Sequence, residues 1–126
     1  MIHGIESVLL FSEDAKKLAA FYREKVGLKV TFEGDMGEHK EEIFGFEMKK
    51  GSGFSIIDHS KVKGKNKGPE RIIINFEVDK IEPEVKRLVA AGVKLVTDIY
   101  HVQEYGKIAT FEDIDGNYFQ LVQVHS

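Results

Sequence analysis

The sequence predicts an α+β protein made of two tandem βαβββ modules. Two observations predict this fold. First, an apolar run of strand length is followed by a helical pattern that ends at a glycine and then by further strands, and this order occurs twice. Second, a segment rich in lysine and glycine separates the two occurrences near the middle of the chain. The alternative is a pair of unrelated α+β pieces of similar length.

The first module is predicted within residues 1–60. Its opening strand, SVLLF, begins at Ser7. Ser12 then offers a capping hydroxyl with acids directly after it, and apolar residues recur at helical spacing as far as Val26. Gly27 is expected to end the helix. Three strands should follow in LKVTFE, EEIFGFEMKK and FSIIDHS, with a turn in GDMGEHK between the first two.

The second module is predicted within residues 71–126 and repeats this order. Residues 61–70, KVKGKNKGPE, are expected to form a solvated linker between the modules. After the strand RIIINFEV, the helix is expected from Asp79 to Ala91 with Pro83 in its first turn. Gly92 should end it. VKLVTDIYHV is the next strand, and GKIATFED and NYFQLVQV form a closing hairpin around a turn that contains Asp-Gly-Asn.

Composition limits the possible partners. The chain has 126 residues, of which 42% are hydrophobic and 31% charged, and its net charge is −3. Nucleic acid is not an expected partner, because phosphate binding usually leaves a basic face. The chain has no cysteine, which excludes disulfides, thiol nucleophiles and thiolate metal sites. No apolar run approaches the roughly 20 residues that span a bilayer, and no signal peptide pattern is present. We therefore expect a cytoplasmic protein without a membrane partner.

Two stretches resemble a known family. SVLLFSEDAKKLAAFYREKVGLKV resembles the opening module of the vicinal oxygen chelate superfamily, which includes glyoxalase I, the bleomycin-resistance proteins and the extradiol dioxygenases. GKIATFEDIDGNYFQLVQ resembles its closing hairpin, with Ile114 where the family usually has proline. The resemblance extends over nearly the whole chain and is weakest from Gly34 to Gly53. It implies eight strands that form a curved mixed sheet around a cup, with the helices outside. An open curved sheet leaves edge strands and apolar surface that a partner would cover, so a homodimer is expected.

The resemblance also implies where a metal would bind. The metal enzymes of this superfamily hold a divalent ion with inward-facing side chains, typically His and Glu, one from each of four strands. The matching positions of this chain are Ser7, Ser55, Ile73 and Gln120. Glutamine is an occasional ligand, serine is a poor one, and isoleucine is none. We therefore expect the usual metal site to be missing, and no cofactor is expected.

A relocated site for a divalent metal is the alternative, with Glu77, Gln120 and His59 as its ligands. Glu77 and His59 are also the candidates for acid–base catalysis. The other interpretation of His59 places it in the loop after its strand, exposed to solvent. Glu77 would be a partly buried carboxylate if it faces the cup, and Arg71 is a candidate partner that would offset the cost.

Period-two alternation separates a polar face from an apolar one in the second module. Asn75 and Glu77 alternate with apolar residues suited to packing under a helix, and Gln120 alternates with Phe119 and Leu121 in the last strand. A register error of one residue would exchange these faces. The residues expected to contact a ligand are Ser7, Leu9, Phe11, Ser55, Ile57, Ile73, Asn75, Glu77, Tyr105 and Gln120.

Three functions follow from these observations. The first is ligand binding: an apolar cup with a few polar groups suits a small, partly aromatic organic molecule, which the protein would bind without the usual metal. The second is a metal-dependent lyase, isomerase or dioxygenase with a relocated site. The third is a degenerate module whose role is association. The neutral or small residues at the four ligand positions favour the first.

Overall fold

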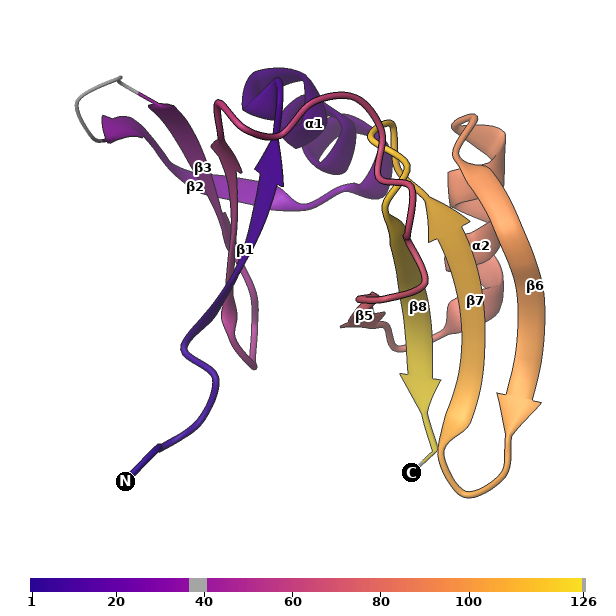
Figure 1. Ribbon diagram of the computed structural model, residues 1–126. Helices are drawn as coiled ribbons and strands as arrows, with labels where there is room; N and C mark the ends of the chain where they lie inside the picture. The colour runs from indigo at the N-terminus through magenta and orange to yellow at the C-terminus, as the bar shows by residue number, and fades with distance from the viewer. Residues whose placement is uncertain (37–40, 126) are drawn as a thin grey trace. The chain divides into compact units, whose positions relative to one another are not determined.

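The computed structural model describes residues 1–36 and 41–125, and it confirms two tandem βαβββ modules (Figure 1). The modules are two compact units, Met1–Gly64 and Lys65–Ser126, and each builds its own four-stranded mixed sheet. The boundary between the units lies inside the segment predicted as a linker. The predicted turn GDMGEHK covers residues 34–40. Its first three residues belong to a strand that continues to Met36, and the others lie outside the described residues.

In the first unit the strands lie in the order β1-β4-β3-β2, with β1 parallel to β4 and the other pairs antiparallel. The unit consists of β1 (Ser7–Ser12), α1 (Ala15–Phe21), the π-helical turn η1 (Tyr22–Val26), β2 (Lys29–Met36), β3 (Glu41–Glu47) and β4 (Gly53–Asp58). The helix packs on one face of this sheet, where Phe46 stacks on Phe54 at 5.5 Å between ring centroids and Tyr22 meets Phe54 edge-on at 5.8 Å. These rings and the buried Leu18 and Ile56 form the core of the unit.

The start of α1 differs from the prediction that Ser12 caps it. Asp14 is the N-cap, and its carboxylate accepts a hydrogen bond from the Lys17 N–H at 3.1 Å. The buried hydroxyl of Ser12 instead accepts from the Asp14 N–H at 3.0 Å. The Ala15 N–H donates to Asp58 at 2.7 Å, across a long interval of sequence. The predicted end at a glycine is confirmed, because Gly27 follows the helical turns with φ 96°.

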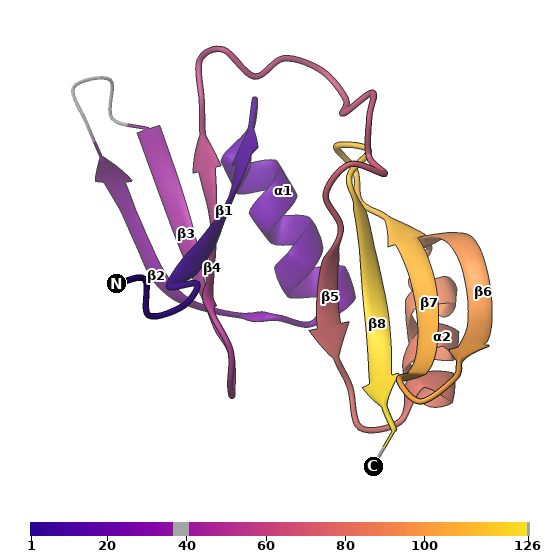
Figure 2. The ribbon, with the colours of Figure 1, turned by 60° about the horizontal axis from the view of Figure 1, so that its bottom comes forward.

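In the second unit the strands lie in the order β5-β8-β7-β6, and Figure 2 shows α2 along one face of this sheet. The unit consists of β5 (Ile74–Glu77), α2 (Ile81–Ala90), β6 (Lys94–Val102), β7 (Gly106–Glu112) and β8 (Tyr118–Val124). Strand β5 is parallel to β8 and shorter than predicted, because the chain is still turning where the Arg71 N–H donates to the Gly68 carbonyl. Phe111 stacks on Phe119 under the helix at 5.6 Å.

Helix α2 begins two residues later than Asp79, where the prediction placed its start. The side chain of Lys80 makes no cap, and the Ile81 N–H donates to Gln123 Oε1 at 2.9 Å instead. Pro83 lies in the first turn, as predicted, where its missing N–H costs nothing. The helix ends before Gly92, which has φ 86°.

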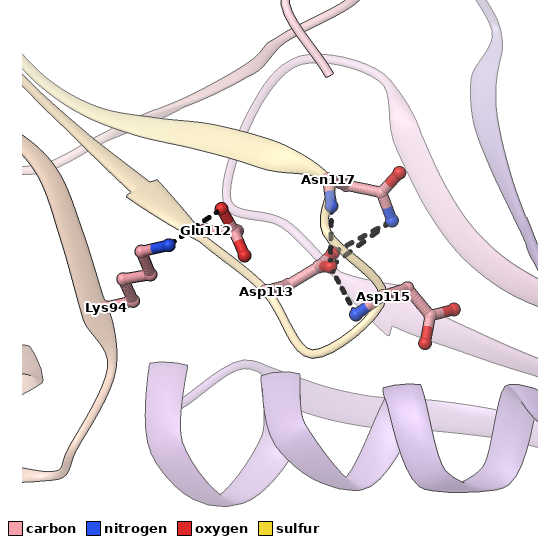
Figure 3. Close-up of polar contacts among 5 residues, drawn as sticks. All are labelled: Lys94, Glu112, Asp113, Asp115 and Asn117. Carbon is pink, nitrogen blue, oxygen red and sulfur yellow. Dashed lines mark hydrogen bonds and ion pairs between the residues drawn. The ribbon is translucent and has the colours of Figure 1, made fainter. Parts of the chain in front are cut away.

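The turn between β7 and β8 is held by one buried carboxylate (Figure 3). Asp113, which is 3% exposed, accepts hydrogen bonds from the backbone N–H groups of Asp115 at 2.9 Å and Asn117 at 3.0 Å. Asn66 then binds this turn: its N–H donates to the Asp115 carbonyl at 2.8 Å, and its side-chain nitrogen donates to Asn117 Oδ1 at 3.0 Å. Asn66 of the predicted linker is therefore bound to the closing hairpin, in a segment that is largely exposed.

Candidate functional site

Five of the predicted ligand-binding residues share one face of the first sheet, the face opposite α1. Leu9 pairs with Ser55 across β1 and β4, and Gly45 of β3 pairs with Ser55 and with Phe32 of β2. Paired residues project to the same side of a sheet, and alternate residues of one strand do so too. This face, called the first open face below, is formed by Ser7, Leu9, Phe11, Phe32, Gly45, Ser55 and Ile57.

Three large apolar side chains of the first open face are exposed. The exposed fractions are 49% for Leu9, 37% for Phe11 and 56% for Phe32. Leu9 and Phe11 come from β1 and Phe32 from β2, the two edge strands of this sheet. The strand pairing places Leu9, Ser55, Gly45 and Phe32 in one row across the face. Clustered exposed apolar groups on a folded protein usually mark a place where something binds.

Two glycines let the Phe32 ring lie along the sheet. A Cβ atom built on Gly45 would lie 3.3 Å from the Cβ of Phe32, and one built on Gly34 would lie 3.2 Å from its Cζ. The ring therefore extends over the position that a side chain at residue 34 would occupy. Phe32 was not predicted from the sequence, because a bulge between Val30 and Phe32 interrupts the period-two pattern. The glycine two residues after Phe32 was the signal that could have indicated it.

His59 lies in the loop after β4, as one of its two interpretations proposed. Its ring meets the ring of Phe11 edge-on, with 5.3 Å between the centroids. Its Nδ1 accepts a hydrogen bond from the Lys61 N–H at 3.0 Å, so a neutral ring carries its proton on Nε2. His59 thus borders the first open face.

The polar residues predicted in the second module share the face opposite α2. Asn75 pairs with Gln120 across β5 and β8, and Gln120 pairs with Thr110 across β8 and β7. The Gln120 Nε2 donates to Thr110 Oγ1 at 2.9 Å. Glu77 lies two residues after Asn75 on this face and is exposed. The second open face comprises the exposed Asn75 and Glu77, the partly exposed Gln120, and the buried Ile108, Thr110 and Val122.

Two predicted site residues lie outside both faces. Ile73 precedes β5 and is not part of a strand. Tyr105 lies in the turn between β6 and β7, is 41% exposed, and accepts a hydrogen bond at its backbone carbonyl from the His125 N–H. Thr110 was missed, although counting outward from the turn of the closing hairpin would have placed it opposite Gln120.

The residues at the family's metal positions do not fit a divalent ion. Ser7 and Ser55 offer only hydroxyl groups and Ile73 offers no donor. Gln120 offers a single neutral amide oxygen, and one such ligand cannot hold a divalent ion in competition with water. In residues 1–36 and 41–125, no three His, Asp or Glu side chains are grouped so that they could hold a metal ion. We therefore derive no chemistry through a metal.

Comparison with known families agrees with this arrangement. Residues 4–121 match the family model of the Glyoxalase/Bleomycin resistance protein/Dioxygenase superfamily. The chain belongs to this superfamily. The match covers both units. It confirms the resemblance that the opening module and the closing hairpin show to the glyoxalase superfamily.

Individual proteins resemble the chain along nearly its full length. The YetH protein of Bacillus subtilis (strain 168) is 29% identical over 122 residues, which are 96% of this chain and 98% of YetH. The structure of TnmS3, an antibiotic binding protein from Streptomyces sp. CB03234, has a TM-score of 0.74 at 22% identity and covers 98% of both chains. A mutant of FosX, a fosfomycin resistance protein from Listeria monocytogenes, was solved with Mn(II) and 1S,2S-dihydroxypropylphosphonic acid. It has a TM-score of 0.74 at 18% identity, and the alignment covers 99% of this chain and 95% of FosX.

These similarities show the fold of this glyoxalase superfamily member. They agree with the two βαβββ modules of the structure. Neither helix of the part of the chain that the structure describes has the length and apolar composition that a membrane crossing needs.

Proposed function

We propose that this glyoxalase superfamily member binds a small, partly aromatic organic molecule and does so without a divalent metal. The observation that supports this most is the exposure of Leu9, Phe11 and Phe32 together on the first open face. The proposed ligand contacts on this face are Ser7, Leu9, Phe11, Phe32, Ser55 and Ile57. Asn75, Glu77 and Gln120 are a separate set of proposed contacts, on the second open face of the other unit.

The physical argument is the burial of apolar surface. Removing about 100 Å² of apolar surface from water contributes roughly 2.5 kcal/mol, and a well-placed aromatic pair adds about 0.5–1.5 kcal/mol. Phe32 is suited to such a pair, because its ring extends over Gly34 and is more than half exposed. Ser55, which pairs with Leu9 and Gly45, offers a hydroxyl group beside this apolar surface.

The relatives support binding as a function of this fold. TnmS3 is described as an antibiotic binding protein, and the FosX structure contains both Mn(II) and an organic phosphonate. The residues of the present chain favour binding without the ion, since serine and isoleucine stand where metal ligands are expected. We propose that the chain binds its molecule in the cytoplasm and as a homodimer.

The proposal is tested with 2-methoxynaphthalene, a flat aromatic probe without a hydrogen-bond donor. Its affinity is measured by titration calorimetry for the unaltered protein, for Phe32→Ser and for Ile72→Ser. We expect Phe32→Ser to weaken binding roughly tenfold or more, because the ring that the probe would cover is lost. Ile72 is the matched control: it is also a large exposed apolar residue, but it lies outside both open faces. Equal affinities for all three proteins would overturn the proposal.

A further inference from the structure

The side-chain amide of Gln120 is held in one orientation. Its Nε2 donates to Thr110 Oγ1 at 2.9 Å, and Thr110 is buried. The two residues are direct partners in the antiparallel pair of β7 and β8, so the strand register fixes their separation. In the part of the chain that the structure describes, no donor is bonded to Gln120 Oε1. A carbonyl oxygen can accept two hydrogen bonds, so Oε1 is the part of this amide suited to a partner.

The surroundings of Gln120 add further acceptors. Asn75 is its direct partner in β5 and is exposed. Glu77 lies on the same face and is also exposed, and an ionised carboxylate only accepts hydrogen bonds. A face with an oriented carbonyl oxygen and a carboxylate attracts N–H and O–H groups and repels anions.

We infer that the second open face selects a bound molecule by a hydrogen-bond donor, an aromatic O–H or N–H group, which Gln120 Oε1 accepts. Thr110 acts as a positioning residue, since it contacts the amide nitrogen of Gln120 and determines which end of the amide is presented. The inference rests on the proposed function, because the molecule selected is of the small organic kind proposed above.

Two substitutions separate the positioning role from a role in folding. Thr110→Val keeps the shape of the side chain but removes the oxygen that accepts from Gln120. Thr110→Ser keeps that oxygen. In the protein alone, the proton resonances of the Gln120 side-chain amide report the bond to Thr110. We expect them to shift in Thr110→Val and to remain close to those of the unaltered protein in Thr110→Ser.

The deciding experiment compares 2-naphthol with 2-methoxynaphthalene, which share a ring system and differ in the O–H group. Binding is followed by nuclear magnetic resonance at the Gln120 side-chain amide and at Leu9, Phe11 and Phe32. We expect 2-naphthol to bind roughly tenfold more tightly than 2-methoxynaphthalene and to shift the Gln120 amide. This preference should be lost in Thr110→Val and kept in Thr110→Ser, while the affinity for 2-methoxynaphthalene stays the same in both variants.

The outcomes distinguish this inference from the proposed function. Equal affinity for the two probes, with both shifting Leu9, Phe11 and Phe32, would overturn the donor requirement and leave the proposed function standing. A preference for 2-naphthol that survives in Thr110→Val would also overturn the inference. If neither probe shifts the three apolar residues, the proposed function itself fails, and the inference that rests on it fails too.

Discussion

At the scale of single residues, two glutamines of the last strand have different tasks. Gln120 and Gln123 lie on opposite faces of β8, because they are three positions apart in a strand whose side chains alternate between its two faces. Gln123 faces α2 and accepts a hydrogen bond from the first N–H group of that helix, at Ile81. Gln120 faces away from the helix and bonds to Thr110. Gln123 therefore belongs to the fold and Gln120 to the proposed site.

This difference predicts unequal effects on stability. Gln123→Ala removes the acceptor that caps α2, and losing a helix cap costs about 1 kcal/mol. Gln120→Ala is the matched control on the same strand, and we expect it to change the free energy of unfolding by less than half as much. Chemical denaturation of both variants measures the two values. A larger loss for Gln120→Ala than for Gln123→Ala would contradict the assignment.

At the scale of elements, the sequence predicted how the helices end better than how they begin. Gly27 and Gly92 end them through their own positive φ angles, which is a local property. The first N–H groups of α1 and α2 are bound by Asp58 and Gln123, which come from distant strands. A search for a capping residue next to the helix could not find these partners. The prediction of Ser12 as the cap was wrong for a local reason, because Asp14, two residues later, is the N-cap.

Some features of the strands could not be predicted from local sequence either. The polar and apolar faces of β5 and β8 were predicted correctly, because both strands keep a regular period of two. Phe32 was missed because β2 contains a bulge before it. The start of β5 was placed too early, since the apolar residues Ile72 and Ile73 resemble a strand although the chain still turns there. A local irregularity of the backbone is therefore the reason why Phe32, a residue of the proposed site, was not predicted.

Helix α2 also has a charged contact with β7 that can be followed by titration. Glu82 Oε2 lies 2.8 Å from the Lys107 Nζ, and this hydrogen bond lowers the pKa of Glu82 below its ordinary value. A lowered pKa means that the contact stabilises the fold above the pKa of the unfolded chain. That contribution is lost as the pH falls through the lower pKa of the folded protein.

We expect Lys107→Met to raise the pKa of Glu82 towards its ordinary value, because the main cause of the shift is removed. Carbon-13 titration of the glutamate carboxyl groups measures this pKa. The control is Lys94→Met, which breaks the ion pair with Glu112 instead and should leave Glu82 unchanged (Figure 3). An unchanged pKa of Glu82 in Lys107→Met would show that the contact does not persist in solution.

At the scale of the whole molecule, each unit holds its own end of the connecting segment. The Gly64 N–H donates to Glu13 of the first unit at 3.2 Å, and Asn66 is bound to the closing turn of the second. The lysine-rich composition predicted a boundary in this segment, and the structure places one there. Composition could not predict these contacts, because they depend on side chains far away in the sequence.

The chain is also expected to form a homodimer. The sheets have β1, β2, β5 and β6 as their edge strands, and edge strands offer backbone groups that a second chain can pair with. Sedimentation velocity at tens of micromolar should therefore give the mass of two chains of 14.3 kDa. A single species with the mass of one chain would contradict this expectation.

The central claim is that a small aromatic molecule binds on the first open face without a metal. The most direct measurement is a chemical-shift map of the protein in EDTA, recorded as 2-naphthol is added. The account predicts shifts centred on Leu9, Phe11 and Phe32, and the same map after EDTA is replaced by Mn(II) and the excess ion is removed. Shifts confined to other surfaces, or binding that appears only after Mn(II) is supplied, would contradict it.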